Sequence, residues 1–294
     1  MLLSLRRRSR RAPGGRPREA VVLSGGGSLG AAQVGALRAL FEAGVVPDLL
    51  IGCSVGALNA AFLAMDPSAA RVEQLAEVWG RLERKHVFGG NRRLMATHVV
   101  RGDDHLYEPD ALRDLVRRWV PLRDLGETVV PCHVVTTDLL DGRPCWWSTG
   151  DPVPVLTASA CLPAVFPPVS LGGSLHVDGG VTSPVPVDRA LELGAVRTWV
   201  LDVSGGAIGR RDERMTALDV LLLSFAISRS HLDRGAGPER PGQTVVRLPR
   251  LVQGRHEMRD FSQTERLMDH GYAAARPVVE AALRAVPRQR SATA

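Results

Sequence analysis

The chain has 294 residues, of which 45% are hydrophobic and 23% are charged. This composition is ordinary for a globular domain and argues against disorder of the body. The best apolar run, at residues 220–227, is far shorter than the roughly 18 residues that a membrane-spanning helix needs, so we expect no such helix.

The net charge of +6 is concentrated at the N-terminus. Residues 1–20 hold seven arginines against one acid, Glu19, so the remaining residues 21–294 are neutral overall. A neutral body predicts no nucleic-acid-binding face. We expect residues 1–19 to be a disordered basic tail, which is either a solvated extension or a weak electrostatic tether to anionic lipid headgroups. No apolar segment follows the basic stretch, so it does not resemble a secretory signal.

The four cysteines, Cys53, Cys132, Cys145 and Cys161, form no C-x-x-C pair. Their spacing favours free thiols in a reducing compartment. We therefore expect a cytoplasmic protein, with peripheral contact at the inner membrane surface if the basic tail binds lipid.

Short apolar segments alternate with helical patterns in the first part of the chain. Residues 20–24 and 49–53 are typical of buried strands, and residues 29–43 and 55–65 are typical of helices. A strand, a glycine turn and a helix, repeated twice, predict a parallel sheet covered by helices.

The alternation continues less regularly along the rest of the chain. We predict helices at 69–84, 109–119, 153–160, 186–193, 215–231 and 261–285. We predict strands at 129–137, 143–148, 175–178, 198–203 and 245–248. Residues 87–105 show no clear period, and residues 233–243 are typical of a loop. The order indicates one α/β domain over residues 20–285, a three-layer α/β/α sandwich with a mainly parallel central sheet, followed by a flexible tail at 286–294.

A G-x-S-x-G segment, Gly52-Cys53-Ser54-Val55-Gly56, stands where a predicted strand gives way to a helix. This is the setting of a nucleophile elbow, in which a sharp turn exposes the serine hydroxyl above the sheet. Glycines two residues before and after the serine remove side chains that would collide in such a turn. The pattern favours Ser54 as a nucleophile over an ordinary turn of small residues.

A second glycine-rich segment, GGGSLG at residues 25–30, ends the first predicted strand and opens a helix. Gly25, Gly27 and Gly30 match the dinucleotide fingerprint G-x-G-x-x-G, but no acid ends the second strand to bind a ribose. The other interpretation is an oxyanion hole formed by the backbone N–H groups of Gly25, Gly26 and Gly27 at a helix start. The neighbouring serine favours the oxyanion hole.

An activated serine needs a base, which is usually a histidine oriented by an acid. His231, His256 and His270 come late enough in the chain for a Ser…Asp…His order. Each lies in or near a predicted helix or polar loop, where a surface histidine is the simpler interpretation.

An aspartate that touches the serine directly is the alternative base. Asp178 ends a short predicted strand, and Gly179 and Gly180 follow it. The two glycines let another backbone or a substrate approach the carboxylate, which can then act as the base if it is partly desolvated. Asp202, which precedes the pair Gly205-Gly206, is the rival acid by the same argument.

Four segments occur together in one known family. They are LSGGGSLGAAQVGALRAL at 23–40, GCSVG at 52–56, ASACLPAVFPPV at 158–169 and DGGVTSPVPVDRALELGA at 178–195. The chain thereby resembles the patatin-like phospholipases. The resemblance implies a sheet sandwiched by helices, hydrolysis of lipid acyl esters, and a Ser–Asp dyad in which Ser54 is the nucleophile and Asp178 the base. It also implies an oxyanion hole at Gly25 to Gly27 and no cofactor.

Two features bear on the substrate. Leu29 stands where the family usually has Arg or Lys, so a charge that would support the loop or meet an anionic headgroup is missing. Trp146, Trp147 and residues 165–169 either line an acyl channel, dip into a lipid interface or belong to the core. We expect a lipid or fatty-acyl ester as the substrate.

Other interpretations predict different chemistry. An α/β hydrolase would use a histidine triad, a nucleotide-binding module would use the glycine-rich loop, and a silent scaffold would use neither. Asp103, Asp104 and His105 offer donor atoms for a metal, but no partner cluster with ligand spacing is visible in the sequence, so we expect no metal.

Overall fold

The structure is a computed structural model that describes residues 18–89, 98, 100–203, 207–208, 217–232, 241–249, 251–252, 255–256 and 258–285. The predicted tails, apart from residues 18 and 19, lie outside these residues, as do parts of segments 87–105 and 233–243.

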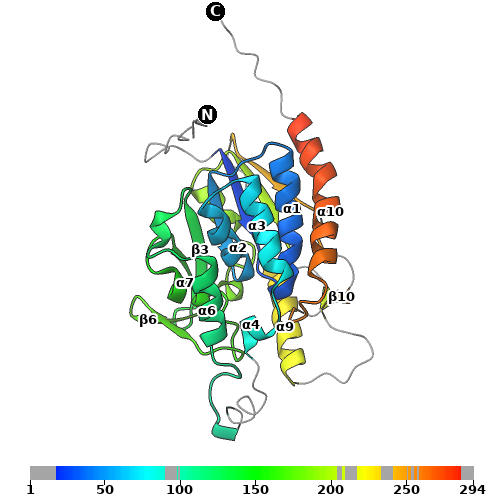
Figure 1. Ribbon diagram of the computed structural model, residues 1–294. Helices are drawn as coiled ribbons and strands as arrows, with labels where there is room; N and C mark the ends of the chain where they lie inside the picture. Colours follow the sequence, from blue (N-terminus) through cyan, green and yellow to red (C-terminus); the bar gives the residue numbers. More distant parts are fainter. Residues whose placement is uncertain are drawn as a thin grey trace, which may run out of the picture.

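A mixed sheet forms the centre of the fold (Figure 1). The order of its strands is β5-β6-β3-β2-β1-β7-β9, with β4 also paired to β3. Its strands are β1 (Glu19–Leu23), β2 (Leu49–Cys53), β3 (Cys132–Asp138), β4 (Pro144–Trp147), β5 (Val169–Leu171), β6 (Ser174–Asp178), β7 (Arg197–Leu201) and β9 (Thr244–Arg247). The pairs β1–β2, β1–β7, β2–β3 and β7–β9 are parallel, whereas β3–β4, β3–β6 and β5–β6 are antiparallel. The short strands β8 (Ala207–Ile208) and β10 (Arg255–His256) pair separately. The predicted, mainly parallel sheet is confirmed.

Helices cover both faces of this sheet. They are α1 (Gly30–Glu42), α2 (Val55–Ala64), α3 (Ala69–Gly80), α4 (Lys85–Phe88), α6 (Asp110–Trp119), α7 (Pro152–Ser159), α8 (Val187–Glu192), α9 (Ala217–Leu232) and α10 (Thr264–Ala285). Every predicted helix is present, although α3 ends four residues before its predicted end. The sequence did not predict α4 or β5, which are too short to show a period.

The central strands bury both of their faces. In β1, Val21 and Leu23 belong to the large core with α1, α2, α3, α7 and α10, whereas Ala20 and Val22 belong to the smaller core with α8. A strand that is covered on both faces buries all of its side chains, as the five residues of β2 do. Its sequence is therefore a continuous apolar run. The two cores on either side of one sheet confirm the predicted three-layer sandwich.

Helices α1 and α10 lie side by side and approach more closely than most side chains allow (Figure 1). A Cβ atom on Gly35 would lie 1.8 Å from the carbonyl oxygen of Met268. A Cβ atom on Gly271 would lie 1.9 Å from the carbonyl oxygen of Ala32. The contact through which α10 closes the large core therefore requires glycine on both helices.

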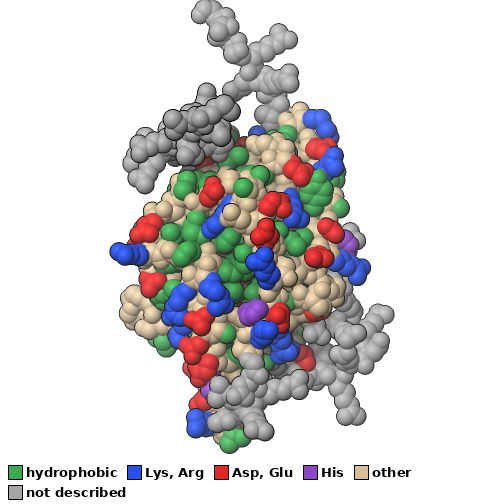
Figure 2. Space-filling view, viewed as in Figure 1, with side chains coloured by type: hydrophobic (Ala, Val, Ile, Leu, Met, Phe, Trp, Pro, Cys, Tyr) green, Lys and Arg blue, Asp and Glu red, His purple; other side chains and the backbone are tan. Residues whose placement is uncertain are grey.

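The surface agrees with the neutral charge predicted for the body. Figure 2 shows one face, on which Lys and Arg side chains are interspersed with Asp and Glu and form no large patch of one sign. Among the described residues, no helix combines the length and the apolar character needed to cross a membrane.

The helix contact gives a stability prediction. Gly35→Ala should lower the free energy of unfolding by about 2–3 kcal/mol, because a methyl group at the contact forces the two backbones apart. Gly80→Ala is the matched control: a Cβ atom on this glycine at the end of α3 would meet nothing within 4 Å. That variant should be unchanged, or more stable by up to about 1 kcal/mol. Urea denaturation of both variants measures the difference, and equal midpoints would refute the account of the contact.

Candidate active site

Ser54 lies between β2 and α2 in a conformation that few residues adopt. Its φ of 54° and ψ of −126° are strained for a residue with a side chain. A Cβ atom on Gly52 would lie 2.4 Å from the carbonyl oxygen of Gly56. One on Gly56 would lie 2.3 Å from the carbonyl oxygen of Leu23. The turn has the shape of a nucleophile elbow and tolerates only glycine at both positions.

Ser159, the last residue of α7, fixes this elbow. Its hydroxyl accepts a hydrogen bond from the Ser54 backbone N–H at 3.0 Å and donates one to the carbonyl oxygen of Val135 at 2.7 Å. The serine thus ties the strained backbone to β3. Ser159 lies in the segment 158–169 that carried the family resemblance, but the sequence alone gave it no role.

The sheet brings Asp178 to the same place. Cys53, at the end of β2, is in register with Val135 of β3. Asp178, at the end of β6, is in register with the next residue, Thr136. Strand β4 pairs with both Val135 and Thr136 from the other side of β3, so β2 and β6 follow one another along the same side of this strand. Ser54 and Asp178 therefore meet where the end of β2 adjoins the end of β6.

The carboxyl group of Asp178 is completely buried, and this burial raises its pKa above the usual range for aspartate. The charge of Arg229, the Ser54 hydroxyl and the backbone N–H of Gly180 oppose the rise. Oδ1 accepts a hydrogen bond from Gly180 N–H at 2.7 Å and lies 3.9 Å from Cys53 Sγ. Oδ2 is buried without a hydrogen-bond partner among the described residues, and the Ser54 hydroxyl lies close enough to lower the pKa of this carboxyl.

Arg229 on α9 brings a positive charge to this pair. Its side chain is 3% exposed and lies between two glycines. A Cβ atom on Gly25 would lie 2.5 Å from its Nη2, and one on Gly180 would lie 2.9 Å from its Nε. Both nitrogens are buried and lack a hydrogen-bond partner within the described part of the chain. The sequence did not predict this residue, because an arginine after an apolar helical run is usually on the surface.

The glycine-rich loop bounds the site on the side of β1. The N–H of Gly25 donates to the carbonyl oxygen of Pro184 at 3.2 Å, and the absence of a side chain on this glycine leaves space for Arg229. The oxyanion hole expected at Gly25, Gly26 and Gly27 stays a prediction.

A buried polar network holds this loop. Gln33 donates to the carbonyl oxygen of Ser24 at 2.8 Å. Asn59 donates to the carbonyl oxygen of Gly30 at 3.1 Å and to the Gln33 side chain at 2.9 Å. The indole of Trp79 donates to Asn59 at 2.9 Å. The network joins α1, α2 and α3, so the position of the loop is set by three helices.

An apolar cavity opens at Ser54. Its walls include Phe88, Trp119 and Phe166, and Arg229 is the one charged side chain that lines it within the described part of the chain. Phe166 belongs to the segment 165–169, which therefore contributes both to the core and to the cavity. The cavity has a polar end at the serine and an apolar body, which is the form of many small-molecule sites.

The other acid and the histidines lie elsewhere or are not described. None of the described residues that line the cavity is a histidine, and His270 lies half-buried on α10. The side chains of His231 and His256 lie outside the described residues. Asp202 follows β7 and is half-buried, and neither it nor Asp178 is among the described residues that line the cavity.

The role of Ser159 can be measured. Ser159→Ala leaves the Ser54 N–H and the Val135 carbonyl without their shared partner, so it should lower the free energy of unfolding by about 1–3 kcal/mol. Ser170→Ala, at an exposed position of β5, should change it by less than about 0.5 kcal/mol. Chemical denaturation of the two variants tests this, and a Ser159→Ala protein as stable as the control would contradict it.

The amino-acid sequence is similar to those of several known proteins. An uncharacterized NTE family protein of Mycobacterium tuberculosis is 29% identical over 230 residues, which are 74% of this chain and 61% of that protein. Patatin-like phospholipase domain-containing protein 6 of Homo sapiens is 30% identical over 196 residues, which are 66% of this chain and 14% of that protein. The chain therefore corresponds to only part of the length of these relatives.

Among solved structures, VipD from Legionella pneumophila matches with a TM-score of 0.50 at 14% identity. The match covers 91% of this chain and 67% of VipD, and it shows similarity of fold. The family model for patatin-like phospholipase matches residues 21–191, which are more than half of the chain and include both Ser54 and Asp178. The chain belongs to the patatin-like phospholipase family.

Proposed function

We propose that the chain is a serine lipid acyl hydrolase that cleaves carboxylic ester bonds of lipids, with Ser54 as nucleophile and Asp178 as its base. One observation carries this proposal: the hydroxyl of a strained serine faces a buried carboxylate with one unpartnered oxygen, at the polar end of an apolar cavity. Such a cavity suits the acyl chain of a lipid. Membership of the family supports the same class of reaction.

The first half of the reaction acylates the enzyme. The Ser54 oxygen attacks the ester carbonyl carbon while its proton passes to Oδ2 of Asp178, and the carbonyl electron pair moves onto oxygen. The N–H groups of Gly26 and Gly27 and the positive end of α2 stabilise this oxyanion, at about 3 kcal/mol for one good donor. The tetrahedral intermediate then expels the alcohol, which takes the proton from Asp178.

The second half releases the acid. Water attacks the acyl-enzyme carbonyl and gives its proton to Asp178. The intermediate collapses, the bond between Ser54 and the acyl carbon breaks, and Asp178 returns the proton to the serine oxygen. Both the serine and the carboxylate are then ready for the next ester.

Arg229 contributes charge compensation in this scheme. The negative charge starts on Asp178 and moves to the oxyanion as the serine proton is transferred. The guanidinium extends from the turn at Gly180 to the loop at Gly25, so it adjoins both the initial and the final position of the charge. A buried carboxylate also needs a nearby cation to stay ionised, and only the ionised form can act as a base.

Membrane contact would help such an enzyme reach its substrate. The basic tail, which lies outside the described residues except at its end, remains our candidate for a tether to anionic lipid headgroups.

The dyad predicts that Ser54→Ala and Asp178→Asn each reduce turnover of a short-chain nitrophenyl ester by about a thousandfold or more. Asp202→Asn is the matched control and should retain activity. Initial rates on folded proteins, with folding checked by circular dichroism, give the comparison. Near-normal turnover by the Ser54 variant would refute the proposed function, and an active Asp178→Asn beside an inactive Asp202→Asn would assign the base to Asp202.

The charge of Arg229 predicts a pH effect. The value of kcat/KM should fall as the pH drops through the pKa of Asp178, and burial of this carboxyl places the fall above the usual range for aspartate. Arg229→Met removes a charge that lowers this pKa, so the fall should move to higher pH, whereas Arg229→Lys should move it less. The Cys53 and Cys161 thiols also face Asp178, but burial raises their pKa values and they do not titrate in this range.

A matched control separates charge from anchoring of α9. Arg259→Met breaks the 2.8 Å ion pair with Asp219 on α9 but leaves the charge of Arg229 in place. It should therefore leave the acid limb of the pH profile where it is. An Arg229→Met protein that folds and has the wild-type pH profile would contradict the proposed role of Arg229.

A further inference from the structure

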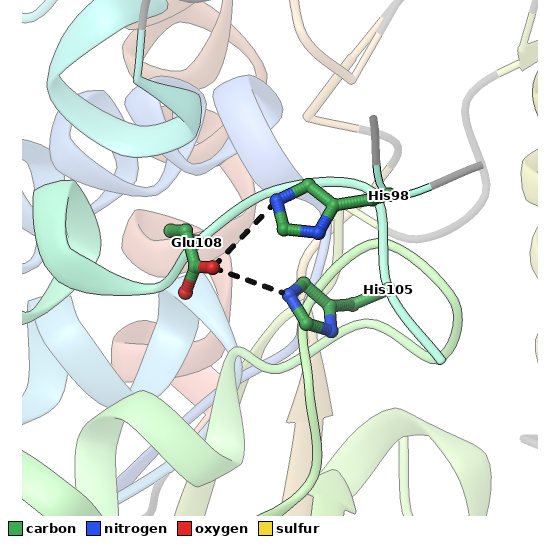
Figure 3. Close-up of side chains that lie close together, drawn as sticks. All are labelled: His98, His105 and Glu108. Carbon is green, nitrogen blue, oxygen red and sulfur yellow. Dashed lines mark ion pairs between the residues drawn. The ribbon is translucent and has the colours of Figure 1, made fainter. Parts of the chain in front are cut away.

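A second cluster of reactive side chains lies on the segment between α4 and α6. His98, His105 and Glu108 point toward one another there (Figure 3). Glu108 Oε1 is 3.6 Å from Nε2 of His98 and 3.6 Å from Nε2 of His105. Each residue directs one ligand atom to a common point, and these atoms all lie within 4.8 Å of one another.

Each imidazole is oriented by an aspartate on its other nitrogen. Asp103 Oδ2 lies 2.7 Å from Nδ1 of His98, and Asp104 Oδ1 lies 2.8 Å from Nδ1 of His105. A carboxylate in this position accepts the Nδ1 proton, so the neutral ring presents its lone pair at Nε2. The two lone pairs therefore face the same point as the Glu108 carboxylate. Carboxylate–histidine pairs of this kind are the usual outer support of a metal site.

The two Nε2 atoms are buried and have no hydrogen-bond partner among the described residues. The side chain of His98 is 6% exposed, and the two rings are only 4.6 Å apart between centroids. The acceptor nearest to both Nε2 atoms is the same oxygen, Glu108 Oε1, at 3.6 Å from each, and protons on both nitrogens would place two positive rings in contact. A metal ion would satisfy both nitrogens and the carboxylate at once.

We propose that His98, His105 and Glu108 bind a divalent metal ion of the zinc class. Two imidazole nitrogens and one carboxylate oxygen are typical zinc ligands. Ligand atoms of a tetrahedral zinc site lie about 3.3 Å apart, so the two 3.6 Å separations from Glu108 need only a small contraction. Three protein ligands leave the fourth position for water, and the carboxylates of Glu108 and the two supporting aspartates more than offset the charge of the ion.

The site lies behind the wall of the apolar cavity and outside the proposed dyad. The N–H groups of Leu106 and Tyr107 donate to the carbonyl oxygen of Val165 at 3.2 and 2.9 Å. The Tyr107 ring packs against Phe88 and Phe166, which line the cavity, at centroid distances of 5.6 and 6.3 Å. The ion would therefore fix the segment that supports this wall, and its role would be structural.

A second group, Asp138, Cys145 and His176, also places ligand atoms close together. It is less suited to a metal, because Asp138 Oδ1 already accepts two backbone N–H groups of its own turn, at 2.9 and 3.0 Å. His176 Nδ1 is paired with the hydroxyl of Thr136 at 3.0 Å. This group provides a matched control for the proposal.

The proposal departs from the expectation of no metal. The sequence shows Asp103, Asp104 and His105 as donors without partners. In the structure the two aspartates contact the Nδ1 atoms of the two histidines, and His98 and Glu108 join His105 as the proposed ligands. The proposal does not depend on ester hydrolysis, so the two can fail separately.

The test uses tag-free protein that has been stripped of metal with a chelator. Titration with zinc by calorimetry should show one equivalent bound, and Co²⁺ should give the visible absorption of a tetrahedral site. His98→Asn and His105→Asn should each weaken zinc binding by about 100-fold, and the supporting variant Asp103→Asn by at least about 10-fold. His176→Asn should bind zinc like the wild type.

Three results would overturn the proposal: no zinc uptake by the wild type, wild-type affinity in both histidine variants, or loss of binding in His176→Asn. If the histidine variants fail to fold, Glu108→Gln keeps the test valid, because the Glu108 side chain is 46% exposed. Zinc should also raise the melting temperature of the wild type and not of Glu108→Gln. Ester turnover is measured on the same samples, and zinc binding without turnover would refute only the proposed function.

Discussion

The burial of one carboxylate beside a strained serine is the constraint on which the site depends. Water would stabilise the charge of Asp178, and the fold excludes water from it completely. The fold compensates with a backbone N–H from Gly180, a serine hydroxyl and the guanidinium of Arg229. Because these groups only partly offset burial, the pKa of Asp178 stays raised. A carboxylate that readily takes a proton is what the proposed Ser–Asp dyad requires.

The rest of the molecule keeps these groups in place. Parallel pairing of β2 with β3 and antiparallel pairing of β6 with the next residues of β3 bring the two candidates together along one side of this strand. Ser159 fixes the elbow, and the network of Gln33, Asn59 and Trp79 fixes the facing loop. The neighbouring atoms leave no room for a side chain at Gly25, Gly52, Gly56 and Gly180, which surround the site. The strands, the helices and the glycine turns thus together hold the Ser54 hydroxyl and the Asp178 carboxyl at the edge of the sheet.

The positive charge reaches the site by a different route from the one the family resemblance suggests. At the position where relatives usually have Arg or Lys, Leu29 is 2% exposed and packs in the large core. Arg229 brings a cation to the same loop from α9, which is far away in the sequence. The absence of a basic residue from the loop therefore does not leave the site without a cation.

The sequence predicted the features that depend on local patterns. Buried strands, the elbow at Ser54 and the strand-ending Asp178 all have signatures within a few residues. Ser159, Arg229 and His98 have none, because their roles arise from contacts with segments distant in the chain. Likewise, nothing in the glycine-rich loop reveals that Pro184 occupies the N–H of Gly25.

The most direct test of the account is a crystal structure of the protein after reaction with a nitrophenyl phosphonate, whose adduct resembles the tetrahedral intermediate. The account predicts phosphorus bonded to the Ser54 oxygen, a phosphonyl oxygen within hydrogen-bonding distance of the N–H groups of Gly26 and Gly27, and Asp178 next to the serine oxygen. An adduct on another residue, or an Asp178 carboxyl turned into a separate cavity, would contradict it.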